Sequence, residues 1–323
     1  MPQLSFNTYF YSIFYMFLTW VLLVVGFTLI TVGATWLTNS SAAIAHKLHI
    51  SEYVIGMTIV AVGTSLPELT VSIASTFAGS ADMAIGNIVG SNIFNILFVL
   101  GICALFTPVV FTKSNVRADI PLCIVVSVAL LAMLLNGNLN RIEGLALLLC
   151  YIAIITYSIR SGKQNDEEVE IDENFSWIKS LGMLALGFGG LIYGADLTLD
   201  SAVAIARDLG VSERVIAITL LAGGTSLPEL AASLAAILKG HGAMALGNVV
   251  GSNIANILLI LGTCSSISPL FMKGITTIDL LVMVAAVILL LLSALVCGRG
   301  KIVRGEGVVF LAAYVAYIWY LIG

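Results

Sequence analysis

The sequence predicts an all-α membrane protein with ten transmembrane helices, arranged as two inverted five-helix repeats. Of the 323 residues, 59% are hydrophobic and only 10% are charged, and the mean hydropathy is +1.07. These values lie far from those of soluble domains. Apolar runs long enough to cross a bilayer follow one another along the chain. In addition, one polar segment occurs twice, as AVGTSLPEL from Ala61 and as AGGTSLPEL from Ala222.

The apolar runs are separated by short polar loops. Each run has about 20 residues or more, the length that crosses the hydrocarbon core of a bilayer as a helix. The ten spans are expected at residues 14–45, 52–77, 81–107, 118–136, 141–160, 176–206, 212–238, 243–270, 276–297 and 305–322. The first and sixth runs are longer than a bilayer requires, so these two helices are expected to tilt.

The repetition extends beyond the first polar segment. GNIVGSNIFNIL at 86–97 recurs as GNVVGSNIANIL at 247–258, and ISEYVIGMT at 50–58 recurs as VSERVIAIT at 211–219, all with the offset of 161 that separates positions 61 and 222. One constant offset over about 50 residues indicates two homologous halves. Because five spans are an odd number, the second half enters the membrane from the opposite side, which is the inverted-repeat plan of many secondary transporters.

The predicted division is a first repeat at 1–160, a linker at 161–175 and a second repeat at 176–323. Ten of the 14 Lys and Arg residues fall on the side opposite the termini. The positive-inside rule therefore predicts a multi-pass plasma (inner) membrane protein with both termini outside and a cytoplasmic linker. The acidic linker is expected to be solvated and flexible, and a regulatory calcium site there is the less favoured alternative.

Several classes of protein are disfavoured by the composition. The chain has no basic block that would bind nucleic acid, and its five Cys show no CxxC spacing for a disulfide framework or a zinc site. The N-terminus lacks the basic region of a cleaved signal peptide. An intramembrane hydrolase is also disfavoured, because the chain has no GxSxG elbow and no His within the spans near Ser65 or Ser226.

Each copy of the first polar segment places one Glu, Glu68 or Glu229, in the middle of an apolar run. An ionisable residue at that depth is costly and indicates a functional site. Ala61, Thr64 and Glu68 are three and four residues apart, so a helix would place them on one face, with Ser65 beside them. Pro67 removes a hydrogen bond to the carbonyl of the preceding turn. The second half repeats this pattern with Ala222, Thr225, Ser226, Pro228 and Glu229.

The following span of each half carries a second polar stripe. Side chains recur there every four residues, at Asn87, Ser91 and Asn95 and again at Asn248, Ser252 and Asn256. Carboxylates, hydroxyls and amide oxygens suit hard cations such as Ca²⁺ and Na⁺, and two facing carboxylates would balance one Ca²⁺. Four amides, Asn87, Asn92, Asn248 and Asn253, are expected mainly to pack between helices.

Other acidic residues are weaker candidates for the ion site. Asp196 and Asp200 lie in the outward half of the long sixth span, where water would solvate them. Glu52 and Glu213 follow Ser51 and Ser212 at the starts of segments, where helix capping explains them.

At these motifs the sequence resembles the cation/Ca²⁺ exchanger superfamily, and specifically its prokaryotic sodium/calcium exchanger-like members. GTSLPE followed by GNxxGSNIxNI, present in both halves, is similar to the paired repeats of that family. The resemblance implies that the second, third, seventh and eighth spans surround the ions. The ligands that it implies are the backbone of Ala61 with Thr64, Ser65, Glu68, Ser91 and Asn95, and the backbone of Ala222 with Thr225, Ser226, Glu229, Ser252 and Asn256.

The predicted function is a sodium/calcium antiporter that works by alternating access and is not an enzyme. Its partners would be Ca²⁺, Na⁺ and the lipid bilayer, and no cofactor is expected. The oligomeric state stays open, and a monomer is one of the alternatives. A proton-coupled exchanger of Ca²⁺ or another divalent cation is the runner-up, although the GNxxE pattern of that group is replaced here by GNIVG at 86–90. Asn256 resembles the potassium-independent members. A cation channel with a Glu ring is a third alternative.

Overall fold

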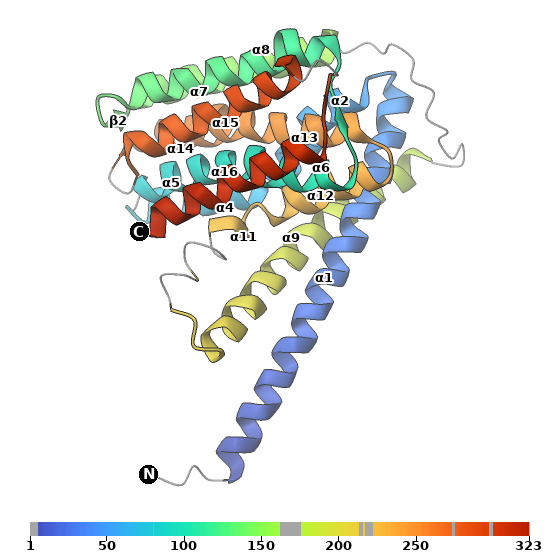
Figure 1. Cartoon of the computed structure of the whole chain (residues 1–323), viewed down its shortest axis with the longest axis vertical. Coiled ribbons are helices and arrows are strands. Elements are labelled where there is room, and N and C mark those ends of the chain that lie inside the picture. The colour runs from blue at the N-terminus through green and yellow to red at the C-terminus, as the bar shows by residue number, and fades with distance from the viewer. Residues whose placement is uncertain are drawn as a thin grey trace.

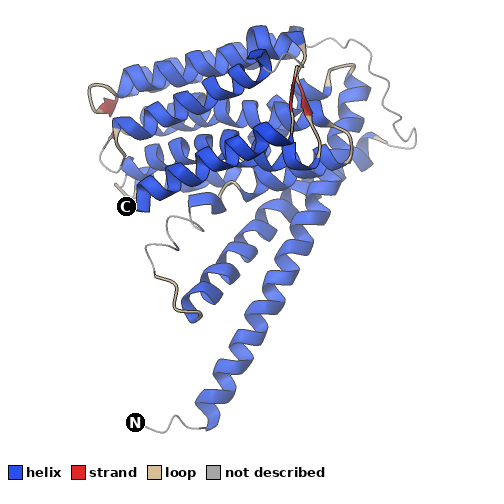
Figure 2. Ribbon diagram, viewed as in Figure 1, coloured by secondary structure: helices blue, strands red, loops and turns tan. Residues whose placement is uncertain are grey.

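In the computed structural model the chain forms a bundle of long helices with very short strands (Figures 1 and 2). The structure describes residues 6–79, 81–161, 176–212, 216, 222–272, 275–296 and 300–322. Within these ranges eight helices are long and apolar enough to cross a membrane, or nine if one bent pair forms a single span. The predicted linker, apart from its first residue, and most of 213–221 lie outside the described residues. The helical membrane fold is therefore confirmed, and the count of ten spans stays a prediction.

The elements of the first half follow the expected apolar runs, and three of its spans contain π-helical turns, labelled η. They are α1 (Phe6–Leu48), α2 (Glu52–Ile55), η1 (Gly56–Val60), α3 (Ala61–Thr64), α4 (Leu66–Phe77), α5 (Ala81–Ile93), η2 (Phe94–Val99), α6 (Leu100–Phe106), β1 (Val109–Val110), η3 (Asn115–Asp119), α7 (Ile120–Leu134), β2 (Asn138–Leu139) and α8 (Arg141–Ser161).

The second half has corresponding elements. They are α9 (Trp177–Asp208), α11 (Ala222–Gly224), α12 (Leu227–Leu238), α13 (Gly242–Ala255), η5 (Asn256–Leu261), α14 (Gly262–Ile267), β3 (Leu270–Phe271), α15 (Thr277–Val296), β4 (Lys301–Ile302) and α16 (Arg304–Ile322). The expected spans at 243–270, 276–297 and 305–322 thus correspond to helices that begin and end within a few residues of the predicted bounds.

The second span is broken at Ser65. Ser65 has φ −84° and ψ 8°, Pro67 lies in the first turn of α4, and the helices on either side of the break meet at 44°. A proline is tolerated in the first turn of a helix, where its missing N–H costs nothing, but not in the middle of one. The single helical face expected for Ala61, Thr64 and Glu68 is consequently divided between α3 and α4, which places Glu68 in the first turn of a new helix.

The two longest helices, α1 and α9, pack along each other and cross the remaining helices obliquely (Figure 1). Glycines allow their backbones to approach closely. A Cβ on Gly33 would lie 2.7 Å from the backbone N of Leu191, and a Cβ on Gly187 would lie 2.8 Å from the backbone N of Leu37. Small residues allow such close packing in membrane helices. The two runs that are longer than a bilayer requires therefore form one crossed pair, and their tilt in the membrane stays a prediction.

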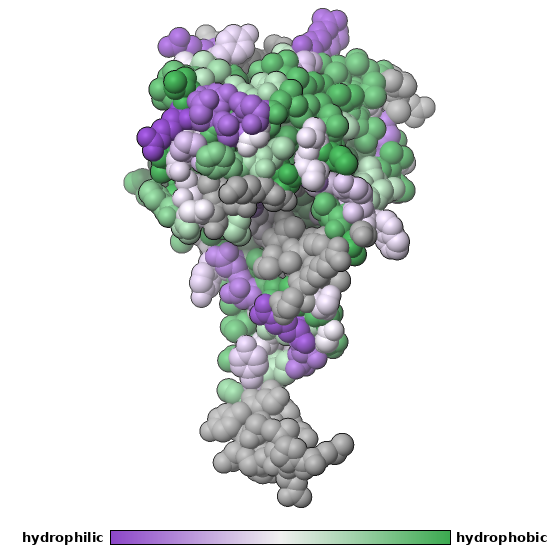
Figure 3. All heavy atoms as spheres, turned by 90° about the vertical axis from the view of Figure 1, so that its left-hand side faces the viewer, coloured by the Kyte–Doolittle hydropathy of each residue, from purple (hydrophilic) through white to green (hydrophobic). Residues whose placement is uncertain are grey.

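The remaining helices form the body of the molecule. Its centre is α13, in which every residue from Met244 to Ala255 is buried. Broad hydrophobic areas lie on the face of this body that Figure 3 shows, beside smaller hydrophilic ones. Two antiparallel strand pairs, β1 with β4 and β2 with β3, join the halves. The body is therefore held together both by helix packing and by backbone pairing between loops of different halves.

Candidate cation site

The two intramembrane glutamates lie at the starts of helices deep in this body. Glu68 is in the first turn of α4 and Glu229 in the first turn of α12, and both side chains have no solvent exposure. The positive end of a helix dipole favours a carboxylate in this position. The proline of each motif thus creates a helix start inside the bilayer, and the glutamate follows it.

Serines join the two glutamates across the halves. The Ser65 hydroxyl donates to Glu229 Oε1 at 2.9 Å, and the Ser226 hydroxyl donates to Glu68 Oε1 at 2.9 Å. Each serine is three residues before the glutamate of its own half and bonds the glutamate of the other half. The two polar segments therefore face each other at one centre, as the sequence predicts for Ser65, Glu68, Ser226 and Glu229.

The third span of each half contributes a second hydroxyl. Ser91 donates to Glu68 Oε1 at 3.4 Å, and Ser252 lies 3.5 Å from Glu229 Oε1. Ser252 also reaches the backbone carbonyl of Ala61 at 3.4 Å. The structure thus brings Ala61, Ser91 and Ser252 to the glutamates. Ala222 begins α11, next to residues outside the described ranges.

The threonines and two of the asparagines form bridges behind the carboxylates. Thr64 donates to Asn248 Oδ1 at 3.2 Å, and Thr225 donates to Asn87 Oδ1 at 3.4 Å. The amide groups of Asn87 and Asn248 in turn donate to the carbonyl oxygens of Glu68 and Glu229, both at 3.4 Å. In this structure Thr64 and Thr225 bond amides of the opposite half, and Asn87 and Asn248 hold the helices together, as expected for packing residues.

Two serines that the sequence analysis missed complete this network. Asn87 donates to Ser72 at 3.2 Å, and Asn248 donates to Ser233 at 2.9 Å. Both serines are fully buried and lie four residues after the glutamate of their motif. Their spacing and their offset of 161 from each other are the signals that could have identified them.

Three asparagines bond one another where the third span meets α13 and η5. Asn92 donates to the Asn253 carbonyl at 3.2 Å, and Asn253 donates to the Asn92 carbonyl at 3.1 Å. Asn256 also donates to Asn92 Oδ1, at 3.0 Å. Asn95, at the corresponding position of the first half, is buried, and neither of its side-chain polar atoms has a partner among the described residues. This part of the centre is therefore asymmetric.

Several oxygens in this polar centre are buried without a hydrogen-bond partner among the described residues. They are Glu68 Oε2, Glu229 Oε2, Asn95 Oδ1, Asn253 Oδ1 and Asn256 Oδ1. Buried polar atoms in folded proteins are nearly always satisfied, so each such oxygen calls for an explanation. A hard cation is a chemically suitable partner for carboxylate and amide oxygens. Among the described residues no group of three or more His, Cys, Asp or Glu is found, so hydroxyl, amide and backbone oxygens would have to complete the ligands of such a cation.

Other residues considered at the sequence level lie elsewhere. Ser51 caps α2 by accepting a hydrogen bond from Val54 N at 3.3 Å, as expected for this helix start. Glu52 contacts His241 Nδ1 at 2.7 Å, and the sequence did not predict this pairing. Asp196 and Asp200 are exposed on α9, and no role at the polar centre is assigned to them. Glu213 lies outside the described residues.

A buried pair of carboxylates among hydroxyl and amide groups, inside a bundle of apolar helices, is the arrangement of a membrane transport protein for cations. Comparison with known proteins specifies the family. The family model described as sodium/calcium exchanger protein matches residues 18–160 and 179–323. The chain belongs to this family.

Relatives cover nearly the whole chain. The sodium/calcium exchanger MaX1 of Methanosarcina acetivorans is 30% identical over 342 residues, covering 92% of this chain and 97% of MaX1. The inner membrane protein YrbG of Escherichia coli is 32% identical over 319 residues, covering 94% and 96%. A solved structure of the sodium-calcium exchanger NCX_Mj, soaked with 10 mM Na⁺ and zero Ca²⁺, matches with a TM-score of 0.83 and 35% identity, covering 94% of this chain and 98% of that one. Two of these relatives are named as sodium/calcium exchangers and the third as an inner membrane protein.

Proposed function

We propose that the protein is a sodium/calcium antiporter that exchanges Na⁺ for Ca²⁺ at the centre formed by Glu68 and Glu229. The observation that carries this proposal is the crossed serine bridge, which leaves one oxygen of each buried glutamate free for a cation. The names of MaX1 and NCX_Mj, both sodium/calcium exchangers, support the same substrates.

The proposed ligands are the oxygen donors of the centre. They are Glu68, Glu229, Thr64, Ser65, Thr225, Ser226, Ser91, Ser252, Asn95 and Asn256 with the backbone oxygens of Ala61 and Ala222. The two carboxylates contribute a formal charge of −2, which balances one Ca²⁺ or two of the Na⁺ ions that replace it. Because Ca²⁺ and Na⁺ would use the same carboxylates, simultaneous full occupancy is disfavoured by repulsion between the cations, by several kcal/mol at short distance and reduced dielectric. This competition couples the two fluxes.

The proposed transport cycle is alternating access within two inverted five-helix repeats. The crossed pair α1 and α9 would slide over the body that holds the polar centre, opening it to each side in turn. The equivalence of the repeats supports this cycle. Adding 161 to β1, at 109–110, gives 270–271, which is β3, and each of these strands pairs with a strand of the other half. The positive-inside rule places both termini outside in this proposal.

Calcium uptake into proteoliposomes tests the proposal. Purified protein would be reconstituted with Na⁺, K⁺ or H⁺ inside, and isotopic Ca²⁺ uptake measured after dilution into a medium without that ion. Uptake that requires the outward Na⁺ gradient is expected. Uptake driven by H⁺ alone would favour the proton-coupled alternative, and uptake that needs no counter-ion gradient would indicate a channel.

A further inference from the structure

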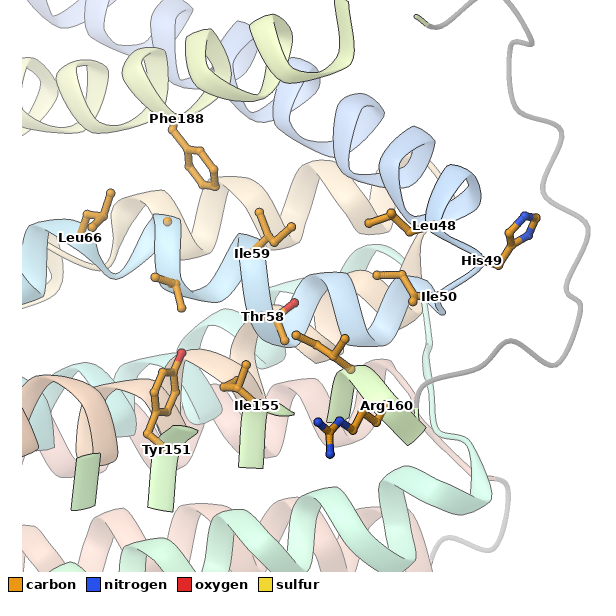
Figure 4. A pocket seen from close by; sticks show the side chains of 13 residues that line it. Leu48, His49, Ile50, Thr58, Ile59, Leu66, Tyr151, Ile155, Arg160 and Phe188 are labelled. Atoms are coloured by element: carbon orange, nitrogen blue, oxygen red, sulfur yellow. The ribbon is translucent and has the colours of Figure 1, made fainter. Parts of the chain in front are cut away.

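A large apolar groove runs along the second span between α8 and α9 and has a volume of about 1220 Å³ (Figure 4). Ile59, Val62 and Leu66 of the second span form its floor, and Ile155 and Ile159 of α8 form one wall. Phe188 projects from α9 on the opposite side. The volume exceeds the ~300–1,000 Å³ of typical small-molecule pockets, so a long flexible ligand fits it better than a compact one.

The groove lies at the membrane depth of the hydrocarbon chains. Ile59, Leu66 and Ile159, which line it, are 36%, 38% and 49% exposed, and they belong to helices that we place in the bilayer. From Ile50 to Leu66 the second span covers about 24 Å at the helical rise per residue. One leaflet contributes about 15 Å, half of the ~30 Å hydrocarbon core. A lipid chain of one leaflet that enters beside Ile50 therefore covers somewhat more than half of the length of the groove.

One end of the groove is polar and basic. Arg160, in the last turn of α8, and His49, just after α1, both line this end with exposed side chains (Figure 4). No Asp or Glu is among the described residues that line the groove. A guanidinium group binds phosphate oxygens through paired, charge-assisted hydrogen bonds. This end of the groove therefore complements an anionic headgroup at the membrane surface.

We propose that this groove binds an anionic phospholipid, with its phosphate at Arg160 and one acyl chain along the second span. Headgroup contacts provide the selectivity, because the hydrocarbon of any lipid matches the apolar walls equally well. The bound chain also lies beneath Phe188, which packs on Gly63 directly before Thr64. The lipid would thus fill the space between the crossed helix pair and the back of the polar centre.

Lipid retention measured by native mass spectrometry tests the headgroup selectivity. The full-length protein would be exposed in detergent to equal amounts of phosphatidylglycerol and phosphatidylcholine with identical chains. We expect phosphatidylglycerol to be retained about fivefold more, the preference that one interfacial basic residue provides, and Arg160→Gln to abolish it. Arg117→Gln removes another exposed arginine at the start of the neighbouring span and should leave the preference unchanged. Equal retention of both lipids by the wild type, or an equal loss in both variants, would overturn the proposal.

A second measurement places the acyl chain. Ile155→Trp adds a fluorophore to the groove wall, and lipids with brominated chains quench tryptophan on contact. The quenching gained over the wild type should be stronger with brominated phosphatidylglycerol than with brominated phosphatidylcholine, and this difference should disappear when Arg160→Gln is added. Identical quenching by both lipids would contradict the site. Neither readout depends on ion transport, so failure here leaves the antiport proposal untouched.

Discussion

Ser65 of the first half donates a 2.9 Å hydrogen bond to Glu229 of the second half, although 164 positions separate them in the chain. The matching bond from Ser226 to Glu68 makes the relationship mutual. Each serine therefore orients the carboxylate of the opposite half, so that the free oxygen of that carboxylate has a fixed position. If these carboxylates bind the transported ion, each carboxylate ligand consists of a glutamate from one half that is oriented by a serine from the other half.

Ser65→Ala should weaken Ca²⁺ binding without preventing folding. A hydrogen bond to a charged group contributes about 1.5–3 kcal/mol, so the Ca²⁺ concentration for half-maximal uptake should rise about tenfold or more. Ser226→Ala should have a similar effect, because its bond has the same length. Ser127→Ala is a suitable control, since that buried hydroxyl donates to the carbonyl of Cys123 in its own helix at 2.8 Å and takes no part in the polar centre. Unchanged affinity in both site variants would contradict the proposed role of the bridge.

Glu68→Gln and Glu229→Gln should each remove most Ca²⁺ uptake. The substitution keeps the shape of the side chain but removes one of the two negative charges that balance the divalent ion. Gradient-driven isotope uptake measures the effect, and detergent size-exclusion profiles check folding. Glu143→Gln serves as a matched control, because Glu143 accepts from Asn140 N at the exposed start of α8 and glutamine caps a helix there equally well. Uptake near the wild-type rate in both site variants would rule out the two-glutamate centre.

Gly187→Ala should destabilise the crossed pair of α1 and α9. The added Cβ would lie 2.8 Å from the backbone N of Leu37 and 3.0 Å from the carbonyl oxygen of Gly33, so the helices must separate. Overpacking of this kind costs about 1–3 kcal/mol, and the unfolding temperature in detergent should fall. Gly189→Ala, two residues further along α9, meets no atom within 4 Å and should have no such effect. Equal unfolding temperatures for the two variants would contradict the close packing.

Lys239→Met should loosen the contact between α12 and α1. The Lys239 ammonium donates to Asn39 Oδ1 at 2.6 Å and to the Thr35 carbonyl at 3.4 Å, and partial burial lowers the pKa of this lysine. In the first half, the position that corresponds to Lys239 is 78, where the residue is Ala78. The first half therefore has no lysine to make the equivalent contact with α9, which is the counterpart of α1. Losing the bond should increase amide hydrogen exchange around residues 35–45 of α1. Asn39→Ala should have the same effect, and the double variant should add little to it; fully additive effects would show that the two residues act separately.

Much of the fold could be predicted from the sequence, because its signals are local or repeated. A run of about 20 apolar residues identifies a membrane helix without any knowledge of its neighbours. The duplicated motifs predicted that Glu68, Glu229 and the serines beside them lie together, since equivalent positions of homologous halves tend to meet at their interface; their role as ion ligands stays a prediction. The family followed from the same motifs.

Other features depend on contacts that local patterns do not encode. The break at Ser65 follows from Pro67, but its 44° angle depends on the helices packed around it. Ser72 and Ser233 become part of the network only because Asn87 and Asn248 lie opposite them. The pairing of Glu52 with His241 joins positions 189 residues apart. The number of spans and the membrane orientation stay predictions.

The π-helical turns η2 and η5 have a consequence for how these spans can change in length. Asn95 lies within η2 and Asn256 begins η5, so an additional residue is accommodated next to each asparagine. Deleting one residue after Asn95 would remove this bulge and leave buried positions such as Leu100 and Cys103 on the face they already occupy. The same deletion in an uninterrupted α-helix rotates everything beyond it by about 100°, the angle between successive residues. Single-residue deletions should therefore be tolerated better in these two short stretches than elsewhere in the same spans.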